Sequence, residues 1–396
     1  MAVRRKVAVY TGNRAEYGLQ YPIIKSLEEC TEIETFLIVS GAHLDEDFGL
    51  TRSEIERDGF SVFREAPITQ EGDSLFDTTK AIASGILSVA DVLHQLKPDF
   101  CIVYADRYEG LAAMIASTQM NIPTVHIEGG DVTEGGALDD SVRHAMTKLA
   151  HIHFTTNQEA ARRVINLGEE PWRVHNVGFP ALDLIVRGEF APEHEIAERF
   201  FIDLDRPIVL FTQHSITTEV EDASSQVNGA LDALIRLARQ GVQVVATYPN
   251  NDAGGKAIIR AMKSRELDKI ENIQLHKSLG RYNYHGFLNV CGRVTNGACV
   301  GNSSSGIKET PAFGCPVVNI GFRQKGRLRA KNVLDVGYEQ DEILAACEKA
   351  LHDKEFRELC RTAENPYGAG DSGSKIASVL STIEINTALT QKKITY

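Results

Sequence analysis

Short apolar runs alternate with longer amphipathic segments along the whole chain, and this alternation constrains the fold more than any other sequence feature. A short apolar run is typical of a strand buried on both faces, and the amphipathic segment after it is typical of a crossover helix. Strands connected through helices in this way are parallel. The pattern therefore predicts an α/β protein made of repeated β-α units.

The expected elements fall into two successive sets. In the first half the expected strands are Lys6–Tyr10, Thr35–Val39, Phe100–Tyr104, Pro123–Ile127 and His153–Thr155, and the expected helices are Tyr17–Glu29, Leu75–Gln95, Tyr108–Met120, Asp140–Ala150 and Glu159–Leu167. In the second half the expected strands are Ile208–Thr212, Val242–Thr247, Ile273–Leu275, Val294–Val300 and Val317–Ile320, and the expected helices are Gln226–Gln240, Lys256–Arg265, Tyr284–Cys291 and Gly306–Phe313.

The pattern restarts after Phe179–Leu204, where prolines and a charged helix bridge the halves. With 396 residues, the chain is long enough for two doubly wound, Rossmann-like domains, which we place at 1–185 and 200–370. Helical periodicity in Ser374–Leu389 makes 371–396 a candidate to cross back onto the first domain. Ligands of such sheets bind beyond the carboxyl ends of the strands, so we expect the active site in the interdomain cleft.

Charge and cysteine usage exclude several classes of protein. A net charge of −12 argues against nucleic acid or an anionic membrane as the main partner, and no apolar run approaches the length of a membrane span. The basic and briefly apolar start, Met1–Tyr10, is too short for a signal peptide. The seven cysteines are scattered without a C-x-x-C pair, which is typical of reduced thiols in a cytoplasmic protein.

A glycine-rich bend in the first half carries an unusual density of ionisable groups. It comprises His126-Ile-Glu128-Gly-Gly130 and Leu138-Asp139-Asp140-Ser-Val-Arg143-His144, with Asp106-Arg107 upstream. Carboxylates at two strand ends (Asp106, Glu128) and at a helix start (Asp139) indicate acid–base chemistry, although a structural salt-bridge network is the alternative. His126-x-Glu128 resembles a metal pair, but the remaining residues lack familiar ligand spacing, so we expect no metal.

Two other turns of the first half are candidate ligand contacts. Gly12-Asn-Arg14 follows the first strand and opens the first helix, where free amides and an arginine favour an anion. A surface arginine in an ordinary β-α turn is the alternative. The spacing is not that of a dinucleotide fingerprint, so NAD is not expected. His43 lies in the corresponding turn after the second strand and is either a ligand contact or a solvated loop residue.

The second half contains a candidate diphosphate site in Gly301-Asn-Ser303-Ser304-Ser305-Gly306. Serine hydroxyls and free amides at a helix start suit a diphosphate, and Glu309, about a turn into the helix, is placed to accept from a ribose diol. There is no G-x-x-x-x-G-K-[ST] pattern, so a triphosphate-hydrolysing loop is not expected. A capped helix without a ligand is the alternative.

Three further residues follow expected strands of the second half and would point to the same cleft. Arg323 belongs to a basic cluster that either neutralises a phosphate or is a solvated loop. His214 follows Ile208–Thr212, and Asn250 lies in a glycine-containing turn that suits a sugar or nucleotide edge.

These motifs occur together in an order that resembles one protein family. They are Gly12-Asn-Arg14-Ala-Glu-Tyr, Ser40-Gly-x-His43, Asp106-Arg107, His126-Ile-Glu128-Gly-Gly, Asp139-Asp-Ser-x-Arg143-His144, Gly301-Asn-Ser-Ser-Ser-Gly, Arg323-Gln-x-Gly-Arg327 and Asn365-Pro-Tyr. The combination covers nearly the whole chain and strongly resembles the hydrolysing UDP-N-acetylglucosamine 2-epimerases of sialic and related nonulosonic acid synthesis. The resemblance implies two Rossmann-like domains in the GT-B architecture.

The resemblance also implies a reaction and roles for individual residues. UDP-N-acetylglucosamine and water would give UDP and N-acetylmannosamine, through elimination to a 2-acetamidoglycal followed by hydration, without a nicotinamide cofactor. Catalytic roles are implied for Asp106, Glu128, Asp139 and His214, and UDP binding for Arg14, Ser303, Ser304, Glu309 and Arg323. His43, Arg107, His126, Arg143 and Asn250 would contact the substrate. A homodimer or homotetramer is expected.

Alternative functions remain open at this point. A UDP-2,4-diacetamido-2,4,6-trideoxyglucose, of the legionaminate type, is the alternative substrate. A GT-B glycosyltransferase, a non-hydrolysing 2-epimerase and a nucleotide-sugar sensor are alternative classes. The Asp131–Leu138 bend is longer than is usual in the family, and Ala105 stands where a glycine often precedes the Asp-Arg pair.

Overall fold

The computed structural model describes the whole chain except residues 1–3, 45–50, 69–74, 133–137, 217–218 and 250–253. It divides into two compact units. The first comprises 4–131, 138–183 and 367–396, and the second comprises Val132 and Leu184–Pro366. The helix α7 (Ala181–Val186) contains the boundary at Asp183 and Leu184.

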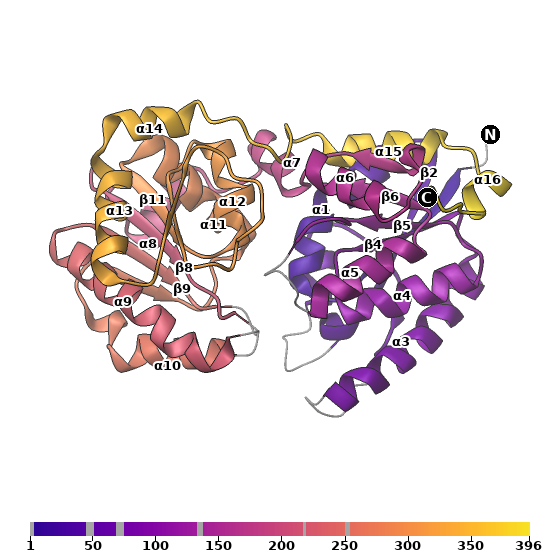
Figure 1. Cartoon of the computed structure of the whole chain (residues 1–396), viewed down its shortest axis with the longest axis horizontal. Helices are drawn as coiled ribbons and strands as arrows, with labels where there is room; N and C mark the ends of the chain where they lie inside the picture. Colours follow the sequence, from indigo (N-terminus) through magenta and orange to yellow (C-terminus); the bar gives the residue numbers. More distant parts are fainter. Residues whose placement is uncertain (1–3, 45–50, 69–74, 133–137, 217–218, 250–253) are drawn as a thin grey trace. The chain divides into compact units, whose positions relative to one another are not determined.

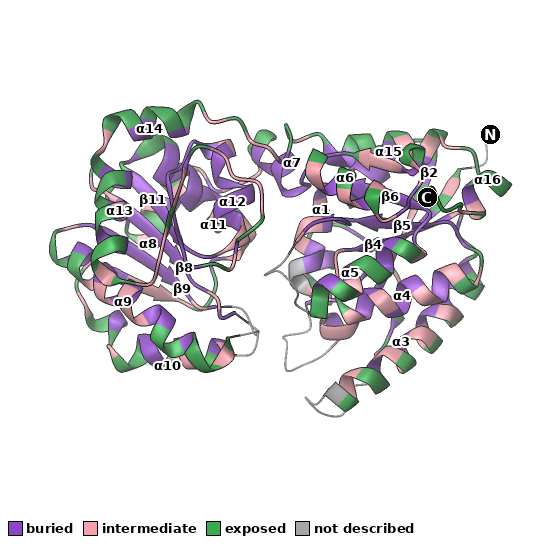
Figure 2. Cartoon of the chain, viewed as in Figure 1, coloured by how far each residue is buried: buried purple, intermediate pink, exposed green. Residues whose placement is uncertain are grey.

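Seven parallel strands, among the described residues, form the sheet of the first unit in the order β3-β2-β1-β4-β5-β6-β7. They are β1 (Arg5–Thr11), β2 (Ile33–Ser40), β3 (Val62–Ala66), β4 (Phe100–Tyr104), β5 (Thr124–Ile127), β6 (Ile152–Thr155) and β7 (Val174–Asn176). The central strands β4, β5 and β6 are buried at every position, as Figure 2 shows in purple. Burial on both faces explains why these strands are continuous apolar runs.

Helices of the first unit complete its β-α units. They are α1 (Arg14–Glu29), α2 (Arg52–Arg57), α3 (Leu75–Leu96), α4 (Tyr108–Gln119), α5 (Leu138–Leu149), α6 (Gln158–Asn166), α15 (Ser372–Thr382) and α16 (Thr387–Thr390). Short 3₁₀ turns occupy Gly41–Leu44 and Pro171–Arg173. One core cluster joins apolar residues of α1 and α15 to one face of the sheet, and a second cluster joins α3, α4 and α5 to the other face.

The chain returns to the first unit for its last helices, which Figure 1 shows in yellow. Ile376, Ala377 and Leu380 of α15 are buried in the same core as α1. The amide groups of Ser372 and Gly373 donate to the buried Asp183 carboxylate at 2.9 and 2.7 Å. A carboxylate at a helix start satisfies free N–H groups and complements the helix dipole, so Asp183 fixes the start of α15.

Six described strands form the second sheet, all parallel, in the order β10-β9-β8-β11-β12-β13. They are β8 (Ile208–Thr212), β9 (Gln243–Thr247), β10 (Ile273–His276), β11 (Gly297–Gly301), β12 (Val317–Ile320) and β13 (Val333–Val336). The helices of this unit are α8 (Glu193–Phe200), α9 (Ala223–Arg239), α10 (Gly255–Ser264), α11 (Gly280–Asn289), α12 (Ser304–Lys308), α13 (Gln340–His352) and α14 (Lys354–Arg361). The predicted fold class, two Rossmann-like doubly wound domains, is confirmed.

Several predicted elements differ from the observed ones for local reasons. The expected helix Gly306–Phe313 is the short α12 followed by a 3₁₀ turn, because Pro311 has no N–H to donate within a helix. The expected helix Ser374–Leu389 is interrupted after Thr382, and Asn386 caps α16 by accepting from the Leu389 amide at 3.1 Å. The expected strand Val294–Val300 begins only at Gly297, since α11 continues as a π-helical turn to Val294.

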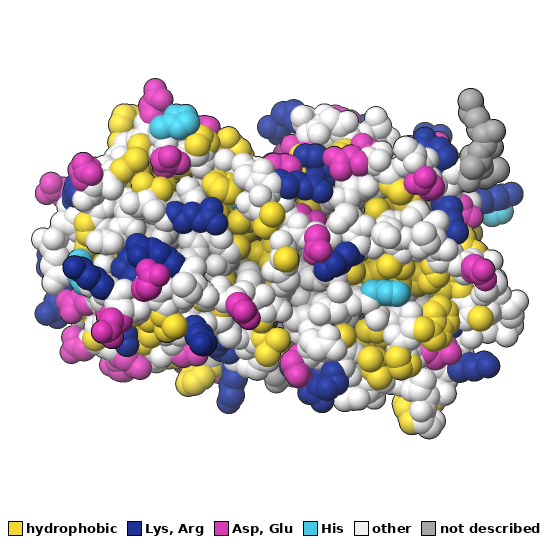
Figure 3. All heavy atoms as spheres, turned by 90° about the horizontal axis from the view of Figure 1, so that it is seen from above, with side chains coloured by type: hydrophobic (Ala, Val, Ile, Leu, Met, Phe, Trp, Pro, Cys, Tyr) yellow, Lys and Arg dark blue, Asp and Glu magenta, His cyan; other side chains and the backbone are white. Residues whose placement is uncertain are grey.

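Three further observations concern the length of the described helices, the cysteines and the charged side chains of the surface. None of the described helices is long and apolar enough to cross a bilayer. All seven cysteines are described and none forms a disulfide; six are buried and Cys30 is partly exposed. On the face drawn in Figure 3, lysine and arginine side chains lie interspersed with aspartate and glutamate side chains.

Candidate functional site

Three of the predicted site residues of the first unit, Arg14, Asp106 and Arg107, follow β1 and β4, which are neighbours in the sheet. The chain leaves β1 toward β2 and leaves β4 toward β5. At such a switch in strand order, the two connecting turns diverge and leave a crevice for ligands beyond the carboxyl ends of the strands. The segment Gly12–Glu16 follows β1 and Ala105–Arg107 follows β4, so the topology brings together two motifs that are far apart in sequence.

Arg143, in the first half of α5, ties several of these motifs together. Its guanidinium is buried, with 4% of the side chain exposed, and pairs with the Asp106 carboxylate. It also donates to Asp140 Oδ1 and to the Asp131 carbonyl, each at 2.8 Å. A planar guanidinium with several N–H groups suits such a cluster of acceptors. Arg143 therefore fixes Asp106 relative to the start of α5.

His126 lies fully buried on β5 and holds the turn that precedes Asp106. Its Nε2 is 2.7 Å from the Ala105 carbonyl and its Nδ1 is 3.1 Å from Thr147 Oγ1. Burial lowers the pKa of His126 to about 4, so the ring is neutral at pH 7. Because a carbonyl only accepts, the one ring proton belongs on Nε2, which leaves Nδ1 as an acceptor facing the Thr147 hydroxyl.

The close approach of His126 and Thr147 requires a glycine next to Glu128. A Cβ atom on Gly129 would lie 3.0 Å from both His126 Nδ1 and Thr147 Oγ1.

Ala105 (φ +58°) and Glu128 (φ +70°) adopt the left-handed conformation, which costs an L-residue other than glycine about 1–2 kcal/mol. Strain of this kind persists only where the surroundings hold it and is concentrated at functional sites.

Glu128 is buried and its backbone N–H donates to the Phe154 carbonyl at 2.9 Å. Its carboxylate is close enough to the phenol of Tyr104, at the end of β4, to disfavour ionisation of that phenol. The pKa of Tyr104 is raised well above its usual value, first by burial and then by the charge of Glu128. Tyr104 thus remains a neutral hydroxyl next to the candidate base.

The remaining predicted residues of the first unit differ in exposure. Asp139, in the first turn of α5, is exposed, and Arg107 is half exposed and pairs with the buried Glu109 at 3.2 Å. His43 is fully buried between Thr11 Oγ1 (3.0 Å) and Thr51 Oγ1 (2.8 Å), and burial lowers its pKa to about 4. The side chain of Arg14 and all of Asn250 lie outside the described residues.

A buried carboxyl pair that we did not predict lies next to the first β-α turn. Glu16 Oε2 accepts from the Gly12 amide at 3.2 Å, and Oε1 accepts from Gln20 Nε2 at 3.0 Å. Burial, and then the charge of Glu109, raise the pKa of Glu16 to about 8. The Asn13-x-x-Glu16 spacing of a capping box was the available signal for Glu16, and the Asn13 side chain accepts from the Glu16 amide at 3.0 Å.

The second unit has its own switch in strand order, between β8 and β11. Asn302, after β11, accepts from the His214 amide at 2.7 Å and donates to the His214 carbonyl at 2.8 Å, which joins the two strand ends. Gly301 has φ +128°, and a Cβ there would lie 1.9 Å from the Thr212 carbonyl oxygen. Only glycine allows this approach.

The serine-rich turn follows at the start of α12. Ser303 caps the helix through its side chain, which is 3.4 Å from the Ser305 amide, and Ser304 begins the helix. Glu309 accepts from Ser305 Oγ at 2.7 Å and contacts His285 Nε2 at 3.0 Å. Burial opposes ionisation of Glu309, but its contacts with His285 and Ser305 outweigh this and lower its pKa. Glu309 is therefore an ionised acceptor.

The basic segment after β12 contacts the same turn. Arg323 and Gln324 both donate to the Asn302 carbonyl, at 3.3 and 2.8 Å. Residues after three strands, at His214, Asn302 and Arg323, are thus connected by hydrogen bonds within one unit. The structure brings together four of the predicted residues of this half: His214, Ser303, Ser304 and Arg323.

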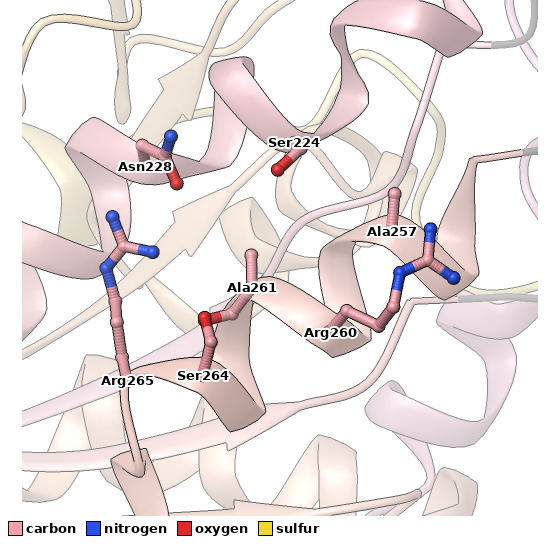
Figure 4. Close-up of a pocket in the computed structure, with 7 residues that line it drawn as sticks. All are labelled: Ser224, Asn228, Ala257, Arg260, Ala261, Ser264 and Arg265. Carbon is pink, nitrogen blue, oxygen red and sulfur yellow. The ribbon is translucent and has the colours of Figure 1, made fainter.

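Two other features do not coincide with the predicted site. A groove of about 410 Å³ between α9 and α10 is lined by Ser224, Asn228, Ala257, Arg260, Ala261, Ser264 and Arg265 (Figure 4), none of which is a predicted site residue. Among the described residues, no group of three or more His, Cys, Asp or Glu side chains is arranged to hold a metal ion. The expectation of a metal-free site stays a prediction.

Comparisons with known proteins agree with the fold and with the family that the sequence resembles. Residues 25–381 match the model of the family described as UDP-N-acetylglucosamine 2-epimerase. A UDP-N,N'-diacetylbacillosamine 2-epimerase (hydrolyzing) from Legionella pneumophila is 32% identical over 98% of each chain. A GDP/UDP-N,N'-diacetylbacillosamine 2-epimerase (hydrolyzing) from Campylobacter jejuni is 32% identical over 90% of this chain and 89% of the relative.

A solved structure shows the same fold at lower sequence identity. The crystal structure of UDP-GlcNAc 2-epimerase from Neisseria meningitidis bound to UDP-GlcNAc superposes with a TM-score of 0.78 at 20% identity, covering 95% of this chain and 99% of the other.

Proposed function

The chain belongs to the UDP-N-acetylglucosamine 2-epimerase family, and we propose that it is a hydrolysing 2-epimerase that converts a UDP-2-acetamido sugar and water into UDP and the free 2-epimer. The observation that carries the proposal is the arrangement around Arg143, which pairs with Asp106 after β4 and with Asp140 in the first turn of α5, while Glu128 follows the neighbouring strand β5. Several carboxylates around one crevice suit proton transfers on carbon.

The proposed chemistry follows from the substrate itself. The C2 proton of such a sugar has no adjacent carbonyl, so simple enolisation does not invert this carbon. Instead, a base removes the C2 proton while the C1–O bond breaks and UDP leaves with the bonding electron pair, which gives a 2-acetamidoglycal. Water then adds its hydroxyl to C1 and a proton reaches C2 from the opposite face. In sum, the UDP-2-acetamido sugar and water give UDP and the free 2-epimer, and no oxidant or reductant is consumed.

We assign the proton transfers at C2 to Glu128 and Asp106, and to Asp139 the orientation or activation of water. His126 and Arg143 would act by holding the Ala105–Asp106 turn and the start of α5. Arg107 and His43 stay predicted substrate contacts.

In the second unit, the Ser303–Ser304 helix start, Arg323 and His214 would stabilise the departing UDP, and Glu309 would accept from the ribose. Arg14 and Asn250 stay predicted contacts to the nucleotide and the sugar. We also propose a cytoplasmic homo-oligomer that needs no metal or nicotinamide.

For the substrate we propose a UDP-2,4-diacetamido-2,4,6-trideoxy sugar ahead of UDP-N-acetylglucosamine, which reverses the order expected from the sequence. The support is the two relatives of 32% identity, both named as diacetylbacillosamine 2-epimerases. The description of the family favours UDP-N-acetylglucosamine as the second candidate.

One incubation tests reaction and substrate together. The purified protein receives each UDP-sugar separately in deuterium oxide, without an acceptor, and UDP release and the proton spectrum of the sugar are followed. We expect free sugar, epimerised at C2 and carrying deuterium there, with the diacetamido sugar used faster. A sugar released without deuterium at C2 would contradict elimination, an epimerised UDP-sugar would indicate a non-hydrolysing enzyme, and strict dependence on an acceptor would indicate a glycosyltransferase.

The variant Glu128→Gln separates the proton transfer proposed for the first unit from the UDP binding proposed for the second unit. We expect turnover to fall by about 10³-fold or more, as for loss of a general base, while UDP binding measured by calorimetry stays within about twofold of wild type. Loss of UDP binding together with turnover would indicate a folding defect or a binding role instead.

A further inference from the structure

The segment after α15 is packed into the first unit by buried groups. Leu389 is fully buried, and the fully buried Arg173 donates to the Leu389 carbonyl at 2.7 Å and to the Ala388 carbonyl. The ring of Tyr396 lies against Gly168, where a Cβ would come within 2.3 Å of a ring carbon. The segment therefore contacts the first unit both at Ala388–Leu389 and at Tyr396.

Lys392, in this segment, meets the end of α5. Its ammonium donates to the Lys148 carbonyl at 2.6 Å and lies 3.5 Å from the Thr147 carbonyl. Carbonyls in the last turn of a helix have no partner within the helix, and a cation there complements the negative end of the helix dipole. Lys392 thus caps α5 from a segment more than 200 residues away in sequence.

The buried Glu169 carboxylate fixes this contact. It is fully buried and pairs with Lys392 Nζ at 2.7 Å, Lys148 Nζ at 2.6 Å and His153 Nε2 at 3.0 Å. Burial opposes ionisation of Glu169, but hydrogen bonds from His153, Lys148 and Lys392 outweigh it and lower its pKa to about 2. The carboxylate is ionised, so both ammonium groups have a counter-charge between them.

The same helix carries the candidate acid–base residues at its other end. Asp139 and Asp140 are in its first turn, and Arg143 pairs with Asp106. Thr147, one residue before the capped carbonyl of Lys148, bonds to His126, which in turn holds the Ala105 carbonyl before Asp106. A displacement of the last turn of α5 would therefore reach the site both through the helix and through His126.

We propose that Lys392 is a positioning residue of the reaction: by capping α5 and pairing with Glu169, it fixes α5 and through it Asp106, Asp139 and Arg143. The inference rests on the proposed function, because it concerns the residues assigned there. It gives the segment 387–396 a role in turnover beyond its contribution to the core.

The first experiment compares Lys392→Ala, Lys392→Arg and the control Lys393→Ala, which removes the neighbouring exposed lysine. Since a misplacement of about 1 Å can cost about 10²-fold in rate, we expect kcat of Lys392→Ala, per folded molecule, to fall at least about tenfold with KM and UDP affinity within about twofold of wild type. Lys392→Arg, which also donates and carries the charge, should recover most of kcat. A lower melting temperature with kcat per folded molecule unchanged would overturn the proposal.

The second experiment does not depend on activity. Hydrogen exchange of α5 amides, followed by mass spectrometry, should increase in Lys392→Ala through to the first turn at Leu138–Ser141 and stay at wild-type rates in Lys393→Ala. Faster exchange confined to the last turn would overturn the proposal. If wild-type protein turned over neither UDP-sugar, the proposed function would fail, whereas the exchange result would still decide whether Lys392 fixes α5.

Discussion

Replacing Glu16 by glutamine should make the stability of the first unit less dependent on pH. The Glu16 side chain is buried beside Glu109, and its pKa is raised to about 8 from 4.5 in the unfolded chain. The folded state therefore binds a proton that the unfolded state loses above pH 4.5. The stability contributed by this proton is complete below the unfolded pKa and is lost as pH rises through the folded pKa.

The size of the effect follows from the two pKa values. One pKa unit corresponds to about 1.4 kcal/mol, so the Glu16 contribution should decrease by about 2.5 kcal/mol between about pH 5 and about pH 7. Glutamine has no such proton. The difference in free energy of unfolding, Glu16→Gln minus wild type, should therefore rise by about 2.5 kcal/mol over that interval, whatever its value at the lower pH. Titrations elsewhere in the chain are common to both proteins and cancel in this difference.

The assay uses the single tryptophan of the chain. Trp172 lies in the first unit, stacked on Arg173 with the guanidinium carbon 4.2 Å from the ring centroid, so its fluorescence during urea unfolding reports on that unit. In a Glu109→Gln background, where the neighbouring charge is removed, the pH-dependent difference should be smaller. An equal stability difference at both pH values would refute the reasoning, because it would show that Glu16 is ionised in the folded protein.

Three further substitutions have expected effects on unfolding, each measured by urea titration. Ala105→Gly removes an L-residue from the left-handed conformation at φ +58°. After the entropy cost of glycine is subtracted, the free energy of unfolding should rise by about 0.5–1 kcal/mol. A lower free energy of unfolding would contradict this and mean that the Ala105 methyl packs favourably. Asp183→Ala removes the carboxylate that accepts from two N–H groups at the start of α15. The free energy of unfolding should fall by about 1–2 kcal/mol. An unchanged urea midpoint would contradict the capping role. Gly301→Ala places a Cβ 1.9 Å from the Thr212 carbonyl oxygen. The free energy of unfolding should fall by about 3 kcal/mol or more. A folded variant with wild-type UDP affinity would contradict the requirement for glycine.

Most of the central elements could be predicted because burial on both faces leaves a clear pattern. Strands such as Phe100–Tyr104 and Ile208–Thr212 have the predicted bounds, since every residue in them is buried. The strands β3, β7 and β13 were not predicted, because they lie at sheet edges and include partly or fully exposed residues. An edge strand has only one neighbour to pair with and needs no continuous apolar run.

The candidate site was predicted at the level of motifs but not of contacts. The order of Asp106, Glu128 and Arg143 along the chain marks strand ends and a helix start, which local patterns reveal. The local patterns do not reveal that Arg143 pairs with Asp106, or that His126 is neutral with its proton on Nε2 and holds the Ala105 carbonyl. These contacts depend on burial and on neighbours 21 to 37 residues away. Glu16 was missed because an N-terminal glutamate of a helix is ordinarily a solvated residue, whereas in the folded chain burial, and then the charge of Glu109 beside it, raise its pKa.

The sequence by itself determined the two Rossmann-like domains, the family and the segments that form the candidate site, because apolar periodicity and short motifs are local properties of the chain. The tertiary structure decided which charges are buried, which protons they keep and which distant segments hold them. Lys392 illustrates the difference: in the sequence it is one lysine in a polar segment, and its contact with the end of α5 exists only because the chain returns to the first unit after Pro366. Desolvation and hydrogen bonding act on groups that are neighbours in space, and only the folded chain defines those neighbours.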